Sequence, residues 1–96
     1  MPRALLSIVL LVAAASLARA QEQPESFRVS DIEPGSTLSV RDRPDAEAEV
    51  VAKIPWNARG VRGAGCTTET PSGRTWCRVK YKGAVGWARR RYLQPE

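Results

Sequence analysis

The stretch TWCRVKYKGAVGW (Thr75–Trp87) has the pattern of two β-strands joined by a tight turn. A two-residue turn at Lys82-Gly83 sets how the two strands pair, because the length of a hairpin loop determines its register. This register places Trp76 opposite Arg89. The stretch therefore predicts an antiparallel hairpin that extends to Arg89, and the rest of the fold is built around it.

The side chains of this hairpin separate into two faces, because successive residues of a strand point to opposite sides. The inner face is small and apolar, with Cys77, Val79, Gly86 and Ala88. The outer face holds Trp76, Arg78, Lys80, Val85, Trp87 and Arg89. Two interpretations stay open for the outer face. Arg78 over Trp87 and Arg89 over Trp76 can be cross-strand cation–π pairs that only cover a small barrel, or the face can bind a partner, since exposed Trp beside Arg is typical of binding hot spots.

The segments before and after the hairpin show no helical period. Short runs of alternating apolar and polar residues are separated by Gly and Pro, which favour turns. The runs are Phe27–Ser30, Thr37–Arg41, Val50–Ile54 and Arg59–Cys66, and Arg89–Leu93 is a final turn or short strand. We therefore expect an all-β fold, a small barrel of five or six short strands.

The first twenty residues have the order of a secretory signal peptide. A short basic start precedes the apolar run Ala4–Leu17, and Ala18-Arg19-Ala20 matches the A-x-A cleavage pattern. We expect cleavage after Ala20, a flexible leader at residues 21–26 and one domain at 27–96. The alternative is a retained membrane anchor, but the run is shorter than the roughly 20 residues that a span needs. The product is therefore expected to be periplasmic or secreted, without a stable membrane span.

The 96-residue chain has a formal charge of +5, which falls to +3 once Arg3 and Arg19 leave with the signal peptide. Residues 21–50 carry eight acids and three bases, and residues 51–96 carry ten bases and two acids. The two halves partly neutralise each other in one barrel, so a basic patch has to be local to attract a ligand. Cys66 and Cys77 are the only cysteines, and in an exported chain they predict a disulfide.

The residues exclude most catalytic chemistry. The absence of histidine removes Ser-His-Asp and Cys-His nucleophile systems and the commonest metal ligand. Two cysteines are too few for a structural zinc site. The acidic loop at residues 42–49 lacks the spacing of a calcium loop, and weak calcium binding is the alternative to a plain solvated loop. We expect no enzyme activity, no metal and no cofactor.

In their order and spacing, several short motifs resemble the bacterial SH3-like (SH3b) domain family. The motifs are Leu38-Ser39-Val40-Arg41 followed by Pro44, Val50–Pro55, Trp76-Cys77-Arg78-Val79, Tyr81-Lys82-Gly83, and Gly86-Trp87-Ala88 leading to Tyr92-Leu93. The resemblance covers roughly residues 27–93 and implies a strongly bent barrel that binds rather than catalyses, often at bacterial cell walls. The chain departs from SH3 domains that bind proline-rich peptides, because their aromatic pair near Leu38–Asp42 is missing and Arg89 replaces a groove proline.

We therefore expect a single-domain, exported SH3b protein that serves as a binding or accessory module of the cell envelope. The expected ligand is peptidoglycan or another anionic envelope component, and the rival function is regulation of an envelope protein or enzyme. The expected contact residues are Trp76, Arg78, Trp87 and Arg89, with Trp56 and Tyr92 near their edge. For Trp56 the alternative is packing under its loop. Arg89-Arg90-Arg91 resembles a nucleic-acid contact, but export argues against that partner, and we expect Arg90 and Arg91 to be solvated.

Overall fold

The computed structural model describes residues 25–96. The predicted signal peptide and most of the predicted leader, residues 21–24, lie outside the described residues. The first strand begins at Ser26, which pairs with Arg62. This strand thus starts one residue before the predicted domain and includes the last residue of the predicted leader.

The described chain is all-β, as predicted, but it contains seven strands rather than five or six. In chain order they are β1 (Ser26–Val29), β2 (Thr37–Arg41), β3 (Val50–Pro55), β4 (Val61–Thr67), β5 (Trp76–Tyr81), β6 (Ala84–Arg89) and β7 (Leu93–Pro95), with a 3-10 turn, η2 (Arg90–Tyr92), before β7. The strand count rises because the chain pairs again after η2, with Leu93 opposite Val29 of β1. The predicted final turn or short strand is therefore both a turn and a strand.

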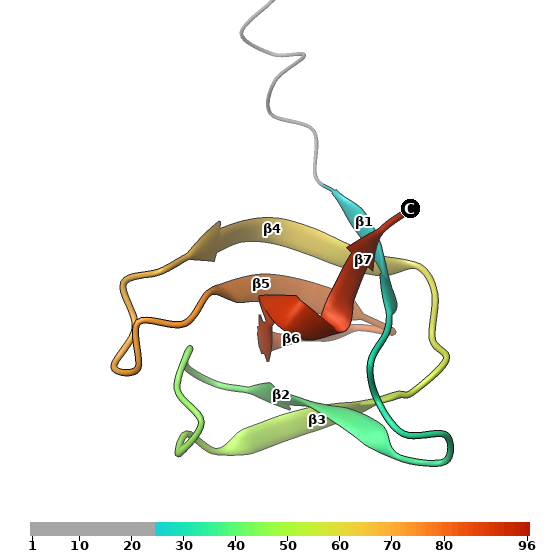
Figure 1. Ribbon diagram of the computed structural model, residues 1–96, viewed down its shortest axis with the longest axis horizontal. Helices are drawn as coiled ribbons and strands as arrows, with labels where there is room; N and C mark the ends of the chain where they lie inside the picture. The colour runs from blue at the N-terminus through green and yellow to red at the C-terminus, as the bar shows by residue number, and fades with distance from the viewer. Residues whose placement is uncertain (1–24) are drawn as a thin grey trace, which may run out of the picture.

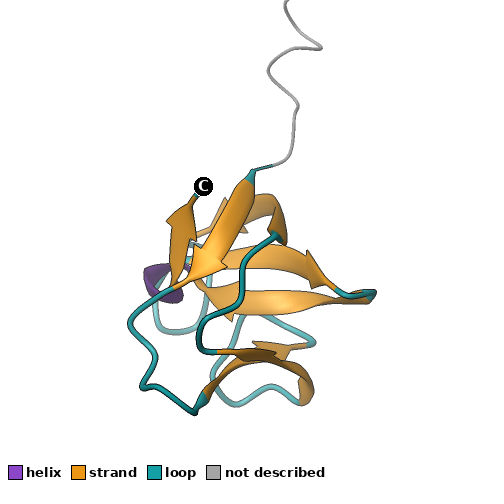
Figure 2. Ribbon diagram, turned by 90° about the vertical axis from the view of Figure 1, so that its right-hand side faces the viewer, coloured by secondary structure: helices purple, strands orange, loops and turns teal. Residues whose placement is uncertain are grey.

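The seven strands form one antiparallel sheet in the order β3-β2-β6-β5-β4-β1-β7 (Figure 1). Within the described residues β3 and β7 are its two edges, so the sheet is not closed into the predicted barrel. It is bent instead. The pairing shifts between Val40 and Arg41, and again between Gly63 and Cys66. Such irregularities bend a strand and increase its twist. The sheet consequently curves around one interior (Figure 2).

The β5–β6 hairpin has the predicted register at every pair, from Tyr81 opposite Ala84 to Trp76 opposite Arg89. Its turn residues, Lys82 and Gly83, have φ angles of 47° and 85°. Positive φ at both central residues defines the turn whose twist matches that of the flanking strands. Lysine accepts this conformation at the first position, although Asn or Asp would adopt it more readily.

The core lies on the concave side of the sheet. The predicted inner residues of the hairpin are buried there, among side chains from the other strands. The whole cluster is Phe27, Val29, Leu38, Val40, Ile54, Ala58, Val61, Cys77, Val79, Ala88 and Leu93. Alternation within each strand therefore decides which residues become core.

Two glycines mark places where no side chain fits. A Cβ on Gly63 would lie 2.4 Å from the ring of Phe27. A Cβ on Gly86 would lie 2.6 Å from the backbone oxygen of Arg41 on β2. Both glycines are buried, so an added methyl group could not avoid these contacts by moving into solvent. Close approach of chain segments, rather than unusual backbone angles, requires glycine at both positions.

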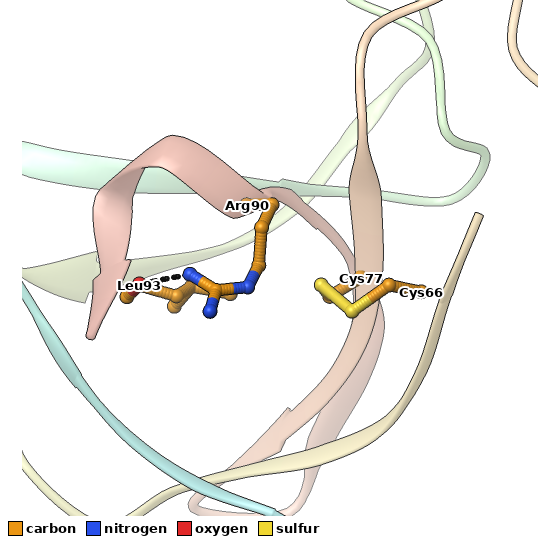
Figure 3. The surroundings of a disulfide bond; sticks show 4 residues. All are labelled: Cys66, Cys77, Arg90 and Leu93. Carbon is orange, nitrogen blue, oxygen red and sulfur yellow. Dashed lines mark hydrogen bonds between the residues drawn. A yellow bond between two sulfur atoms is a disulfide. The ribbon is translucent and has the colours of Figure 1, made fainter. Parts of the chain in front are cut away.

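Cys66 and Cys77 form the predicted disulfide, and they lie opposite each other in the β4–β5 ladder (Figure 3). Beside it, Arg90 departs from the expected solvated state. Its guanidinium lies 5.2 Å from the centre of the Phe27 ring, and Nη1 donates a hydrogen bond to the backbone oxygen of Leu93 (Figure 3). The side chain thus covers the core and holds η2 against β7.

Candidate functional site: a groove beside Trp76

Trp76 is buried, in contrast to the prediction that it is an exposed contact residue. Only 3% of its surface is accessible. The register sends its side chain to the convex face as predicted, but other segments fold over that face. A face that points away from the core of a small sheet can still be covered, and strand alternation alone does not show this.

The cover over Trp76 leaves a groove of about 270 Å³. Its residues come from β2, the two loops that flank β2, the β5–β6 hairpin and η2. They are Ile32, Thr37, Leu38, Ser39, Arg41, Ala46, Trp76, Arg89 and Tyr92. We call this feature the Trp76 groove.

Backbone hydrogen bonds place the walls of the Trp76 groove. The amide of Arg90 donates to the oxygen of Thr75 at 3.0 Å, which holds η2 beside the start of β5. The amide of Ser30 donates to the oxygen of Tyr92 at 2.9 Å, which holds the loop after β1 against η2. The groove is therefore built from segments that are already tied together.

Two residues that line this groove each have a side-chain nitrogen that is buried without a hydrogen-bond partner. The nitrogens are Nε1 of Trp76 and Nε of Arg89, from residues that face each other across the hairpin. A buried donor without an acceptor costs about 1–3 kcal/mol. Such groups in a folded protein call for an explanation, and a bound ligand with an acceptor oxygen is one.

Tyr92 lies between two guanidinium groups. The Arg89 guanidinium is 5.9 Å from the ring centre, and that of Arg91 is 5.0 Å away. One of the two interpretations of the sequence placed Arg89 over Trp76 and Arg78 over Trp87, and neither pair is among the cation–π contacts of residues 25–96. Tyr92, expected near the edge of the site, thus lines the groove beside two cationic groups.

Arg78 and Trp87 were predicted to share the contact surface, but they do not line the groove. They lie opposite each other on the convex face, with Arg78 exposed and Trp87 half-buried. Trp87 is also opposite Arg41, the single β2–β6 register pair. The predicted face therefore divides in two: Trp76 and Arg89 belong to the groove, and Arg78 and Trp87 lie outside it.

Trp56 is exposed rather than packed under its loop, with 36% of its surface accessible. It lines a separate cavity that shares only Ile32 with the Trp76 groove. It is therefore not part of the same contact surface.

The acidic loop approaches the other end of the groove. Nη1 of Arg41 donates to the backbone oxygen of Ala48 at 2.8 Å and so fixes the loop to β2. Asp45 and Glu47 line a neighbouring hollow with Pro71 and Ser72, and Ala46 borders both the hollow and the groove. Carboxylates thus lie near groove residue Ala46, and the Arg89 and Arg91 guanidinium groups lie near groove residue Tyr92.

Sequence reasoning missed six of the groove residues, namely Ile32, Thr37, Leu38, Ser39, Arg41 and Ala46. Thr37 and Ser39 share the face of β2 opposite to Leu38 and Val40, and that alternation was visible in the sequence. The pairing of β2 with β6, which brings this face beside Trp76, carries no local signal. The contribution of the loops also depends on tertiary contacts.

Among residues 25–96, no group of three or more His, Cys, Asp or Glu side chains is arranged to hold a metal ion. The same part of the chain contains no helix long and apolar enough to cross a membrane. The Cys66–Cys77 disulfide is consistent with an exported protein.

Comparison with known proteins finds no matching family model, no matching curated protein and no matching solved structure.

Proposed function

We propose that this protein is an exported SH3-like (SH3b) module, without catalytic activity, that binds a component of the bacterial cell envelope in the Trp76 groove. The observation that carries the proposal is that two residues lining the groove, Trp76 and Arg89, each hold a buried donor without a partner, Nε1 and Nε respectively. An SH3-like fold is supported by the motif order in the sequence and by the small, strongly bent sheet.

The distribution of charge along the groove supports a ligand of mixed polarity. Arg89 and Arg91 beside Tyr92 suit a carboxylate or phosphate, because guanidinium groups bind such anions with two parallel hydrogen bonds. Asp45 and Glu47 beyond Ala46 suit an amine. Cell-wall peptides carry both kinds of group, so peptidoglycan is the favoured ligand.

Sedimentation with purified, insoluble peptidoglycan tests this proposal. The wild-type protein should pellet with the polymer, and Arg89→Ala should pellet about tenfold less readily, which is the loss expected for a hydrogen bond to a charged group. Arg74→Ala is the matched control, because Arg74 is an exposed arginine outside the groove. Equal binding by both variants, with unchanged melting temperatures, would contradict the proposal.

The second candidate function is regulation of an envelope protein, and edge strand β3 favours it. Val50 and Val51 are both exposed on this strand, and one side of β3 has no neighbouring strand in the described chain. An exposed apolar edge is a template for pairing with a strand of another protein. Pull-down from an envelope extract separates the two functions: a captured protein that is lost on Val51→Lys supports regulation.

A further inference from the structure

A second cavity, of about 510 Å³, lies between the end of β1 and the connection from β3 to β4. Its lining combines an exposed indole with several hydrogen-bonding side chains. The residues are Arg28, Val29, Ser30, Asp31, Ile32, Trp56, Asn57 and Arg59. We call it the Trp56 cavity, and it can be occupied independently of the Trp76 groove.

The two walls of the Trp56 cavity are joined by the backbone. The amide of Val29 donates to the oxygen of Ala58 at 2.9 Å, and the amide of Trp56 donates to the oxygen of Ser36 at 3.1 Å. These bonds hold both segments before any ligand arrives. A preformed cavity reduces the entropy that binding has to overcome.

Two features of this cavity are uncommon in folded proteins. The hydroxyl of Ser30 is buried without a hydrogen-bond partner. Asp31, the next residue, has a φ of 59°, a conformation that is uncommon in non-glycine residues, although Asp adopts it more readily than most. Unpaired polar atoms and strained residues gather at binding sites, where the fold maintains a geometry for the ligand.

The charges around the Trp56 cavity are balanced. Arg28 and Arg59 supply two positive groups, and Asp31 supplies a negative one. The carboxylate of Glu96 lies 3.7 Å from Nη1 of Arg59 and neutralises it further. The cavity therefore offers many hydrogen bonds but little net attraction for an anion, unlike the Arg89 end of the Trp76 groove.

We propose that the Trp56 cavity binds a neutral saccharide. One face of a sugar ring carries apolar, weakly positive C–H groups, which suit the electron-rich face of an exposed indole. The edges of the ring carry hydroxyl groups that both donate and accept. Asp31 accepts from them, Arg28 donates to them, and the amide of Asn57 does both.

Other ligand classes match this lining less well. A nucleotide brings phosphate groups, for which the balanced charges give no net gain. An apolar side chain of a peptide would bury the exposed Asn57 amide without partners, which is costly. A ligand rich in hydroxyl groups satisfies the indole and the polar groups together.

The test is an NMR titration of the purified, disulfide-bonded protein with neutral oligosaccharides, namely cellotetraose and chitotetraose, and with an acidic oligogalacturonate. At least one neutral sugar should shift the Trp56 indole N–H and the amides of residues 30–32 and 56–59 in a saturable way. Its affinity should change by less than about twofold between roughly 50 and 500 mM salt, because no net charge is neutralised. Preference for the acidic sugar, or saturable shifts centred on Trp76, would overturn the proposal, as would no saturable shift with any of the three.

Variants connect the binding to the cavity. Trp56→Ala should weaken the affinity at least about tenfold, as loss of an aromatic contact does. Arg28→Ala should also weaken it, whereas Arg62→Ala, an equally exposed arginine on the neighbouring strand β4, should not. If a well-folded Trp56→Ala or Arg28→Ala variant binds like the wild type, the cavity is not the site. Arg89→Ala should leave sugar binding intact, which separates this result from failure of the Trp76 groove.

Discussion

Trp76 and Arg89 lie directly opposite each other in the β5–β6 ladder, and each holds a buried N–H group that has no acceptor. Both residues line the Trp76 groove, and Trp76 is also buried. The indole packs on the convex face of the sheet. The Arg89 guanidinium lies 5.9 Å from the ring centre of Tyr92. Stability and binding are therefore expected to respond differently to the two residues.

Trp76→Ala should lower the free energy of unfolding by about 3–5 kcal/mol, the range for removal of a buried aromatic side chain. The reason is its 3% exposure. Urea denaturation measures the change. Trp87→Ala is the matched control, since Trp87 is half-buried on the same face, and its loss should cost clearly less. Equal decreases in the free energy of unfolding would show that the segments packed over Trp76 do not stabilise the fold.

Binding of peptidoglycan should weaken as salt is raised, because exposed charges are screened beyond about 8–10 Å at physiological ionic strength. Arg91→Ala should reduce both the affinity and its salt dependence, since the Arg91 guanidinium lies 5.0 Å from the Tyr92 ring centre on the outside of η2. Isothermal titration with soluble peptidoglycan fragments at several salt concentrations measures both. A salt-independent affinity in the wild type would contradict the proposal that Arg89 and Arg91 bind an anionic group of the ligand.

Loss of the disulfide should destabilise the fold by about 3 kcal/mol on the chain-entropy model, for a loop of this length. Cys66 and Cys77 are 11 residues apart. A Cys66→Ala, Cys77→Ala double variant should melt roughly 12–24 °C below the wild type, at about 4–8 °C per kcal/mol for a domain of this size. Free-thiol titration of the native protein is the direct check, and two reactive thiols would refute the disulfide.

Gly63→Ala should destabilise the protein by about 1–3 kcal/mol, the usual cost of overpacking a core. The added methyl group would lie 2.4 Å from the Phe27 ring, which is itself buried. Val85→Ala on β6 is the control, because Val85 is exposed. Thermal melting compares the two, and a Gly63→Ala variant as stable as the control would mean that the ring moves freely.

We predict that the protein is exported and that its mature form begins at Gln21, because Ala18 and Ala20 supply the small residues that signal peptidase requires. Intact-mass measurement of protein recovered from the periplasm or medium decides this. A mass that retains Met1–Arg19 would indicate a membrane anchor instead.

Much of the strand pattern could be read from local sequence. The Lys82-Gly83 turn set the register of the hairpin, and alternation then identified Cys77, Val79 and Ala88 as core. The disulfide followed from two cysteines in a chain whose first twenty residues predict an export signal. These inferences hold because turn geometry and the two-residue period of a strand act over a few neighbouring positions.

Tertiary contacts decided the rest. The burial of Trp76, the position of Tyr92 between Arg89 and Arg91, and the separation of Trp56 into its own cavity depend on segments far apart in the chain. Alternation assigns a side chain to a face of its strand, but only the packing of loops and of η2 determines whether that face is covered. The sequence by itself determined which residues point away from the core, and the fold determined which of them line a groove, because that depends on what the distant segments place over them.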